Sequence, residues 1–135
     1  MIVEEALYHR LANFAGLAAL VSTRIYPMRL PPAVTLPAVT YQRVSGVRVQ
    51  SLGGPTGLAS PRFQISVWAS TYSAAKAVAT QIRYALDGFQ GNMGASPFIN
   101  VGGITLENEL ELIDPDTQLF HIPSDFTIWH AEATA

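Results

Sequence analysis

The sequence predicts an α+β domain, in which an antiparallel or mixed sheet of about five strands carries two helices on one face. Three observations support this class. Several segments alternate apolar and polar residues, two others repeat apolar residues every three to four positions, and long Gly-rich loops separate them. The expected order is helix, three strands, helix, two strands.

The clearest prediction is a strand that passes directly into a helix between Arg62 and Gly88. Residues 62–69 alternate as a strand with one buried face does, and residues 75–89 place apolar side chains at helical spacing. Ser70, Thr71 and Ser73 each offer a hydroxyl oxygen that is suited to cap the first turn. Gly88 is suited to the left-handed conformation that ends a helix.

The N-terminal part predicts a first helix at Ile2–Phe14, because one stripe of it is apolar. We expect Gly16 to end this helix and Leu17–Val21 to add one short apolar turn. Residues 24–27 read as a brief extended piece. Four prolines in residues 27–37 exclude a helix there and predict a surface loop.

The next strand is predicted at Ala38–Val44, from its alternation. Residues 45–60 are rich in Gly and Ser and predict a mobile hairpin arm or loop, and residues 88–103 predict a long flexible connection. Two strands then follow at Ile104–Ile113 and Leu119–His130, joined by a turn at 114–117.

Length and composition indicate one domain over residues 1–135 that assembles with other chains. Charged residues make up 13% of the chain, against about 25% in typical globular domains. A small domain with so few charges is expected to bury part of its surface against another chain. The absence of cysteine excludes disulfides and thiolate metal sites. No apolar run is long enough to span a membrane, so we expect no membrane contact and no export.

The charges are unevenly distributed along the chain. All eight basic residues precede Tyr84, whereas eight of the ten acidic residues lie at or after Asp87. Either the two halves pair within one fold, or opposite faces of the molecule carry opposite charge. The second arrangement would suit head-to-tail packing in a ring.

No pattern indicates an enzyme. The histidines at 9, 121 and 130 lack the short spacing of metal ligands. His121, Ser124 and Asp125 could be imagined as a nucleophilic triad, but neighbours along a strand point to opposite faces, which argues against it. We therefore expect no catalytic residues, no cofactor and no metal.

Glu107, Glu109 and Glu111 are predicted to form a ladder on one face of a strand. Such a ladder has three possible roles, which are to bind a divalent cation, to pair with arginines of a neighbouring strand or subunit, or to face water. The sequence alone leaves all three open.

The glycines of residues 53–57 only superficially resemble a phosphate loop, because the lysine and hydroxyl of that motif are missing. Eight scattered basic residues in an acidic chain also argue against a nucleic-acid patch. Trp68 and Trp129 lie opposite the main apolar set of their strands. They are either interface anchors or parts of a second small core under the loops.

Taken in order, several segments resemble the tail-completion or tail-terminator proteins of long-tailed bacteriophages. These segments span nearly the whole chain: Arg24–Pro27, Leu36–Tyr41, Pro61–Ala69, the helix to Gly88, Asp114–Thr117 and Ser124–Trp129. The resemblance rests on their order and spacing, because each piece alone is unspecific.

The resemblance implies a structural virion protein, assembled in the host cytoplasm, that forms a ring, commonly a hexamer, at the head-proximal end of the tail. The ring would stop polymerisation of the major tail tube protein and dock onto the connector of the head. Candidate interface residues are Arg48, Gly53, Gly54, Trp68 and Trp129. An acidic lumen, lined by Glu107, Glu109 and Glu111, would let DNA pass without binding.

Two alternatives remain beside this interpretation. One is another neck component, such as a head-completion or connector adaptor protein. The other is a small enzyme or ligand-binding domain with a site beneath residues 45–60. A measurement of particle mass would distinguish the neck component from the enzyme or ligand-binding domain, because the mass of a ring is several times that of the 14.6 kDa chain.

Overall fold

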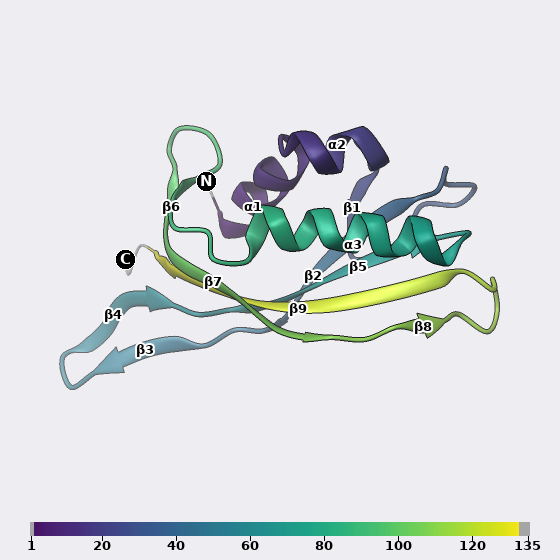
Figure 1. Cartoon of the computed structure of the whole chain (residues 1–135). Coiled ribbons are helices and arrows are strands. Elements are labelled where there is room, and N and C mark those ends of the chain that lie inside the picture. The colour runs from purple at the N-terminus through teal and green to yellow at the C-terminus, as the bar shows by residue number, and fades with distance from the viewer. Residues whose placement is uncertain (1, 133–135) are drawn as a thin grey trace.

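The computed structural model describes residues 2–132, which form three helices and one mixed sheet of nine strands (Figure 1). The helices are α1 (Val3–Ala12), α2 (Ala15–Val21) and α3 (Tyr72–Leu86). The strands are β1 (Ile25–Pro27), β2 (Ala38–Ser45), β3 (Arg48–Ser51), β4 (Gly54–Ala59), β5 (Arg62–Ala69), β6 (Gly91–Met93), β7 (Ile99–Glu109), β8 (Leu112–Ile113) and β9 (Phe120–Ala131). The α+β class is confirmed, whereas the expected five strands and two helices are too few.

Strand β9 is the centre of the sheet, because other strands pair with it along both edges. β5 and β4 pair along one edge, and β7 and β8 pair along the other, all antiparallel. β2 pairs with β5 and β3 with β4, so residues 38–69 form one long hairpin that is interrupted near Ser45 and Ser60. β6 extends the sheet beyond β7, and β1 is the parallel strand beside β2.

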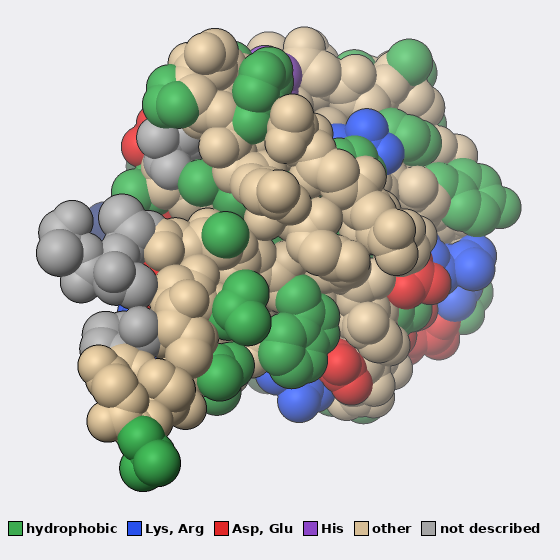
Figure 2. Space-filling view, turned by 90° about the vertical axis from the view of Figure 1, so that its left-hand side faces the viewer, with side chains coloured by type: hydrophobic (Ala, Val, Ile, Leu, Met, Phe, Trp, Pro, Cys, Tyr) green, Lys and Arg blue, Asp and Glu red, His purple; other side chains and the backbone are tan. Residues whose placement is uncertain are grey.

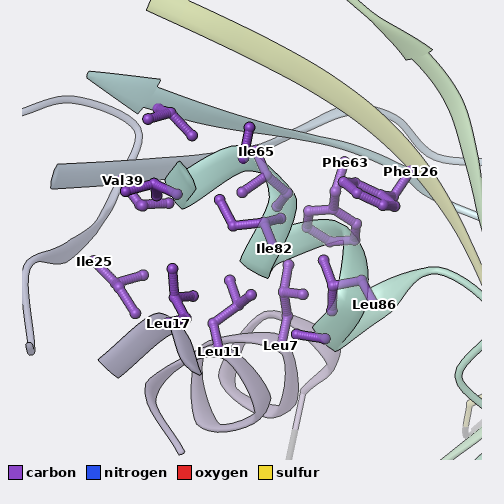
Figure 3. Close-up of a cluster of buried hydrophobic side chains, with 14 of the residues drawn as sticks. Leu7, Leu11, Leu17, Ile25, Val39, Phe63, Ile65, Ile82, Leu86 and Phe126 are labelled. Atoms are coloured by element: carbon purple, nitrogen blue, oxygen red, sulfur yellow. The ribbon is translucent and has the colours of Figure 1, made fainter. Parts of the chain in front are cut away.

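All three helices lie on the same face of the sheet, and the core fills the space between them and the strands (Figures 1 and 3). Phe63 of β5 lies directly opposite Phe126 of β9, and both are fully buried. Around this pair, buried side chains from the helices meet those of the sheet: Leu7, Leu11, Leu17, Ile82 and Leu86 against Ile25, Val39 and Ile65.

The predicted passage from strand into helix is confirmed with its two end signals. The side chain of Thr71 accepts a hydrogen bond from the backbone N–H of Ala74 at 3.2 Å. At the other end, Gly88 has a φ of +82°, which favours glycine. Its N–H donates to the carbonyl of Ile104 at 2.8 Å, so the end of α3 is tied to β7.

The N-terminal helices differ from the prediction. The first helix ends at Ala12 rather than Phe14, and Gly16 lies inside α2 instead of ending a helix. A side chain at Gly16 would collide with that of Gln81 on α3. Glycine at this position leaves room for the end of the Gln81 side chain between α2 and α3. The break between the first two helices falls at Asn13 and Phe14.

Two segments after α3 also differ. Residues 88–103 are not one flexible connection, because they contain β6 and the start of β7, which are anchored by the buried side chains of Met93 and Val101. The strand expected at Ile104–Ile113 is divided. β7 ends at Glu109, residues 110 and 111 belong to no strand, and β8 begins at Leu112.

Candidate assembly interface

The arm, defined as residues 45–60, is a β-hairpin that extends from one end of the sheet (Figure 1). Of the two possibilities left open for residues 45–60, a hairpin arm and a loop, the structure shows the hairpin. Only two of its residues, Leu58 and Ala59, pair with β9. All four residues of β3 are exposed. The exposed large hydrophobic side chains of the arm are Val47, Val49, Leu52 and Leu58.

The end of the molecule that carries the arm exposes several apolar side chains. Figure 2 views the protein from this end and shows separate hydrophobic side chains among other side chains and backbone, with charged side chains at several places on the face. Ile2, Phe98 and Trp129 add further exposed apolar side chains at this end. Arg48 is the one charged residue of the arm. Burial of the arm itself against a partner would therefore remove little charge from water.

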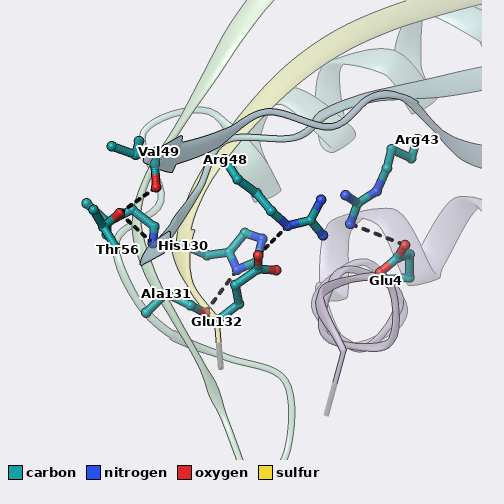
Figure 4. A network of polar contacts seen from close by, with 9 residues as sticks. Glu4, Arg43, Arg48, Val49, Thr56, His130, Ala131 and Glu132 are labelled. Carbon is teal, nitrogen blue, oxygen red and sulfur yellow. Dashed lines mark hydrogen bonds and ion pairs between the residues drawn. The ribbon is translucent and has the colours of Figure 1, made fainter. Parts of the chain in front are cut away.

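Polar contacts fix the base of the arm to the body (Figure 4). Arg48 forms an ion pair with Glu132, just after β9, and Arg43 pairs with Glu4 of α1 at 3.4 Å. The hydrogen bond between Arg48 and Glu132 lowers the pKa of the Glu132 carboxyl below its ordinary value and raises the pKa of Arg48. Within the arm, the hydroxyl of Thr56 donates to the carbonyl of Val49 at 2.9 Å.

A groove of about 570 Å³ lies beside the base of the arm, between β9, the start of α1 and the connection from β6 to β7. Arg43 and Arg48 line it together with their acidic partners, so these charges compensate one another. The buried Nε2 of His130 also lines this region and has no hydrogen-bond partner in the described part of the chain.

β8 lies at the opposite end of the molecule from the arm (Figure 1), and exposed apolar side chains surround it. Leu110, Leu112 and Ile113 are each about half exposed there. We call the hollow at this end the β8 pocket. It has a volume of about 210 Å³ and is lined by Tyr72, Glu111, Leu112, Ile113, Phe120 and Ile122.

The one carboxylate of the β8 pocket is neutralised by α3. Glu111 accepts hydrogen bonds from Lys76 Nζ at 2.7 Å and from the hydroxyl of Tyr72 at 2.9 Å. These hydrogen bonds lower the pKa of Glu111 below its ordinary value, and the one from Lys76 has the larger effect. The same contact with Glu111 raises the pKa of Lys76.

These contacts correct the prediction of one ladder of three glutamates. Glu111 lies outside the strands and pairs with a helix, and a change of register between Leu106 and Asn108 interrupts β7 at Glu107. Glu107 and Glu109 remain exposed on β7. Among the described residues, no group of three His, Asp or Glu side chains is arranged to hold a metal ion.

The five candidate interface residues are divided between the two ends. Arg48, Gly53 and Gly54 belong to the arm, and Trp129 lies next to it, in a hollow that Leu58 also lines. Trp68 is far from them along β5, where its ring stacks on that of His121 with centroids 3.8 Å apart. Its Nε1 donates to the hydroxyl of Thr40 at 3.1 Å, so Trp68 is largely engaged within the subunit.

Two residues at these ends were missed by sequence reasoning, namely Leu52 and Ile113. Leu52 occupies the turn of the arm, and its side chain is fully exposed. A large apolar residue in a two-residue turn was the available signal, because such turns favour Gly, Asn and Asp. Ile113 gave no comparable signal, because it was expected to be the last residue of the strand at Ile104–Ile113.

Pairing within the subunit explains part of the uneven charge distribution. The described residues contain four ion pairs, and three of them join a basic residue of the first half to an acidic residue of the second. These three are Arg48 with Glu132, Arg62 with Asp125, and Lys76 with Glu111. Strand pairing brings the two halves together, as the first of the two interpretations required.

The imagined triad does not form. Asp125 pairs with Arg62 at 3.0 Å, on the face of the sheet that lacks helices. Ser124 is buried on the other face, opposite Ile65, and His121 is stacked on Trp68. Burial lowers the pKa of His121 below its ordinary value. Among residues 2–132, no helix is long and apolar enough to cross a bilayer.

Comparison with known proteins identifies the family. The family model described as "Tail completion protein gp17" matches residues 5–131. A search of curated proteins finds no match. Among solved structures, a chain of the "Virion of native gene transfer agent (GTA) particle" has the same fold, with a TM-score of 0.73 and 24% sequence identity. The alignment covers 93% of this chain and 91% of that chain. The chain therefore belongs to the tail completion protein gp17 family and is a structural protein of a phage-type virion tail.

Proposed function

We propose that the protein, as a single domain, forms a homo-oligomeric ring of six copies at the head-proximal end of the tail. The ring ends polymerisation of the tail tube protein and joins the tube to the connector of the head. The observation that carries this proposal is the family match over residues 5–131. The role is structural and requires no cofactor.

The distribution of apolar surface supports assembly into a ring. Apolar side chains are exposed both on the arm and around β8, at opposite ends of the molecule (Figure 1). Two different surfaces on one subunit permit head-to-tail contacts, and such contacts close into a ring when the rotation between copies allows it. The low charge fraction of 13% fits a protein that buries much of its surface.

The lumen of the ring is proposed to be acidic, so that DNA slides through without binding. Glu107 and Glu109 are exposed on β7 and make no ion pair among the described residues. Carboxylates facing the channel would repel the phosphate backbone of DNA. Glu111 is a weaker candidate for this role, because Lys76 neutralises it.

Light scattering coupled to size-exclusion chromatography tests the ring. The mass expected for six copies is six times that of the 14.6 kDa chain, and it should be constant over a range of protein concentrations. A particle of 14.6 kDa at high concentration would contradict the proposal.

Electron microscopy of particles that lack the protein tests its position in the tail. Overlong tails are expected if the ring stops tube polymerisation. Tails of normal length that fail to join heads would instead assign the protein to the neck as an adaptor.

A further inference from the structure

Leu52 stands at the outermost point of the arm. Ser51 pairs with Gly54, so Leu52 and Gly53 form the two-residue turn between β3 and β4. The relative exposure of Leu52 is 111%, the highest of the large hydrophobic side chains in the described part of the chain. The left-handed backbone conformation at this turn falls on Gly54, whose φ is +116°. The geometry of the turn therefore does not require a leucine at position 52. The apolar tip therefore needs another explanation.

The β8 pocket has the size and character to receive such a side chain. Its volume is about 210 Å³, and an apolar cavity of about 150 Å³ already accommodates benzene. Ile113, Phe120 and Ile122 supply apolar walls. Both hydrogen bonds to Glu111 come from α3, so the pocket presents no uncompensated charge to an incoming side chain.

The tip and the pocket lie at opposite ends of the molecule, so the arm of one copy lies far from its own pocket (Figure 1). We propose that Leu52 of one copy inserts into the β8 pocket of the next copy, and that this contact repeats around the ring. This inference rests on the ring proposed above and specifies which surfaces build it. The contact is head-to-tail, as ring closure requires.

A second copy fits this pocket in charge as well as in size. Arg48 is the only charge of the arm and is already paired with Glu132. Glu111 is the only charge of the pocket and is already paired with Lys76. Docking therefore buries no unpaired charge, whereas an unpaired charge at either surface would oppose it. Val49 and Leu58, exposed along the arm, would extend the apolar contact beyond the tip.

Cysteine cross-linking tests the contact directly, because the chain contains no cysteine of its own. Leu52→Cys and Ile113→Cys chains are purified separately, mixed under reducing conditions and then oxidised. We expect disulfide-linked dimers from the mixture and none from either variant alone. The double variant should give a ladder of linked chains that stops at the number of copies in the ring. Disulfides form only where Cβ atoms lie about 3.5–4.5 Å apart, so the readout is local.

Tyr84→Cys serves as the matched control for Ile113→Cys. Tyr84 is 59% exposed on α3, and it is twelve residues from Tyr72 of the pocket, which is about 18 Å along a helix. A mixture of Leu52→Cys and Tyr84→Cys chains should not form linked dimers. Because all three positions are exposed, the substitutions should not disturb folding, and circular dichroism checks this.

Leu52→Asp provides a second test that does not depend on oxidation. It should reduce the mass in light scattering from that of the ring to 14.6 kDa, while the fold is retained. If the wild-type protein forms a ring but the mixture of Leu52→Cys and Ile113→Cys chains does not cross-link, the proposed contact is wrong. The proposal of a ring would then still stand. Full-size Leu52→Asp rings that fail to cap tubes would also overturn it and assign the tip to the tube protein. A monomeric wild-type chain would contradict the ring itself.

Discussion

Arg48 and Glu132, which are 84 residues apart in the chain, form an ion pair that holds the base of the arm against the end of β9. Besides this ion pair, β4 is attached to the centre of the sheet by two residue pairs, at Leu58 and Ala59, and by a hydrogen bond of 2.8 Å from the N–H of Glu132 to the carbonyl of Gly57. The direction in which the arm extends therefore depends in part on the ion pair between Arg48 and Glu132, which lies outside the hydrophobic core. A substitution in this ion pair can therefore affect the arm without affecting the rest of the fold.

We expect Arg48→Ala to loosen the arm while leaving the core intact. The pair is exposed, and exposed ion pairs contribute little to global stability, so the melting temperature should stay within about 3 °C of the wild type. Hydrogen exchange of the backbone amides in β3 and β4 should become faster. Glu132→Ala should have the same effect, and the double variant should add nothing further. Additive effects of the two substitutions would show that the residues act separately.

His121 should make the fold less stable as the pH falls below neutrality. Burial lowers the pKa of His121 in the folded state below its ordinary value of 6.5. Below pH 6.5 the unfolded chain therefore binds a proton more readily than the folded one, so the free energy of unfolding decreases as the pH falls through this range. Urea unfolding at pH 7.5 and 5.5 measures the loss.

His121→Phe keeps an aromatic ring next to Trp68 and removes the titrating group. Its free energy of unfolding should fall less between the two pH values than that of the wild type. His9→Gln is the matched control, since it removes a histidine of α1 that is only partly buried. An equal pH dependence in the His121→Phe and wild-type proteins would contradict the assignment.

Substitutions at two positions of β9 should distinguish an effect on folding from an effect on assembly. Phe126 is fully buried opposite Phe63, so Phe126→Ala should reduce the free energy of unfolding by about 3–5 kcal/mol. Trp129 is 49% exposed next to the arm, so Trp129→Ala should change it by less than about 1 kcal/mol. Chemical denaturation measures both changes. Light scattering should show that Trp129→Ala weakens assembly. A full-size ring that is stable to dilution would remove Trp129 from the proposed interface.

The sequence predicted best those elements whose local signals agree with one another. β5 and α3 were located correctly because alternation, helical spacing, the hydroxyl of Thr71 and the glycine at 88 all point to the same boundaries. A hairpin arm was one of the two possibilities that the glycines and serines of residues 45–60 indicated. The family resemblance then supplied the role, which the pattern of buried residues could not.

The sequence-based predictions were wrong where the role of a residue depends on a contact with a residue far away in the sequence. Gly16 was taken as a helix end, but its lack of a side chain matters for packing against Gln81, which is far away in sequence. The even spacing of the three glutamates suggested one strand, but β7 ends at Glu109, and Glu111 contacts Tyr72 and Lys76 of α3. The exposed patches at both ends depend on how the sheet is arranged in space, and periodicity does not carry that information.

The proposed lumen leads to a graded prediction for DNA passage. Replacing Glu107 and Glu109 together by Gln should slow DNA ejection from assembled particles, and replacing both by Lys should slow it more. Each step removes repulsion of the phosphate backbone and the second adds attraction. Glu111 is left unchanged, because its loss would also break the contact with Lys76.

Glu5→Lys is the control for a change of charge away from the channel, since Glu5 is exposed on α1. It should leave the ejection rate unchanged. Raising the salt concentration should reduce the effect of the lysine variant, because ions screen its attraction for DNA. If all three variants ejected DNA at the wild-type rate, the two glutamates would not line the channel, and the ring would have to be oriented with another face toward the DNA.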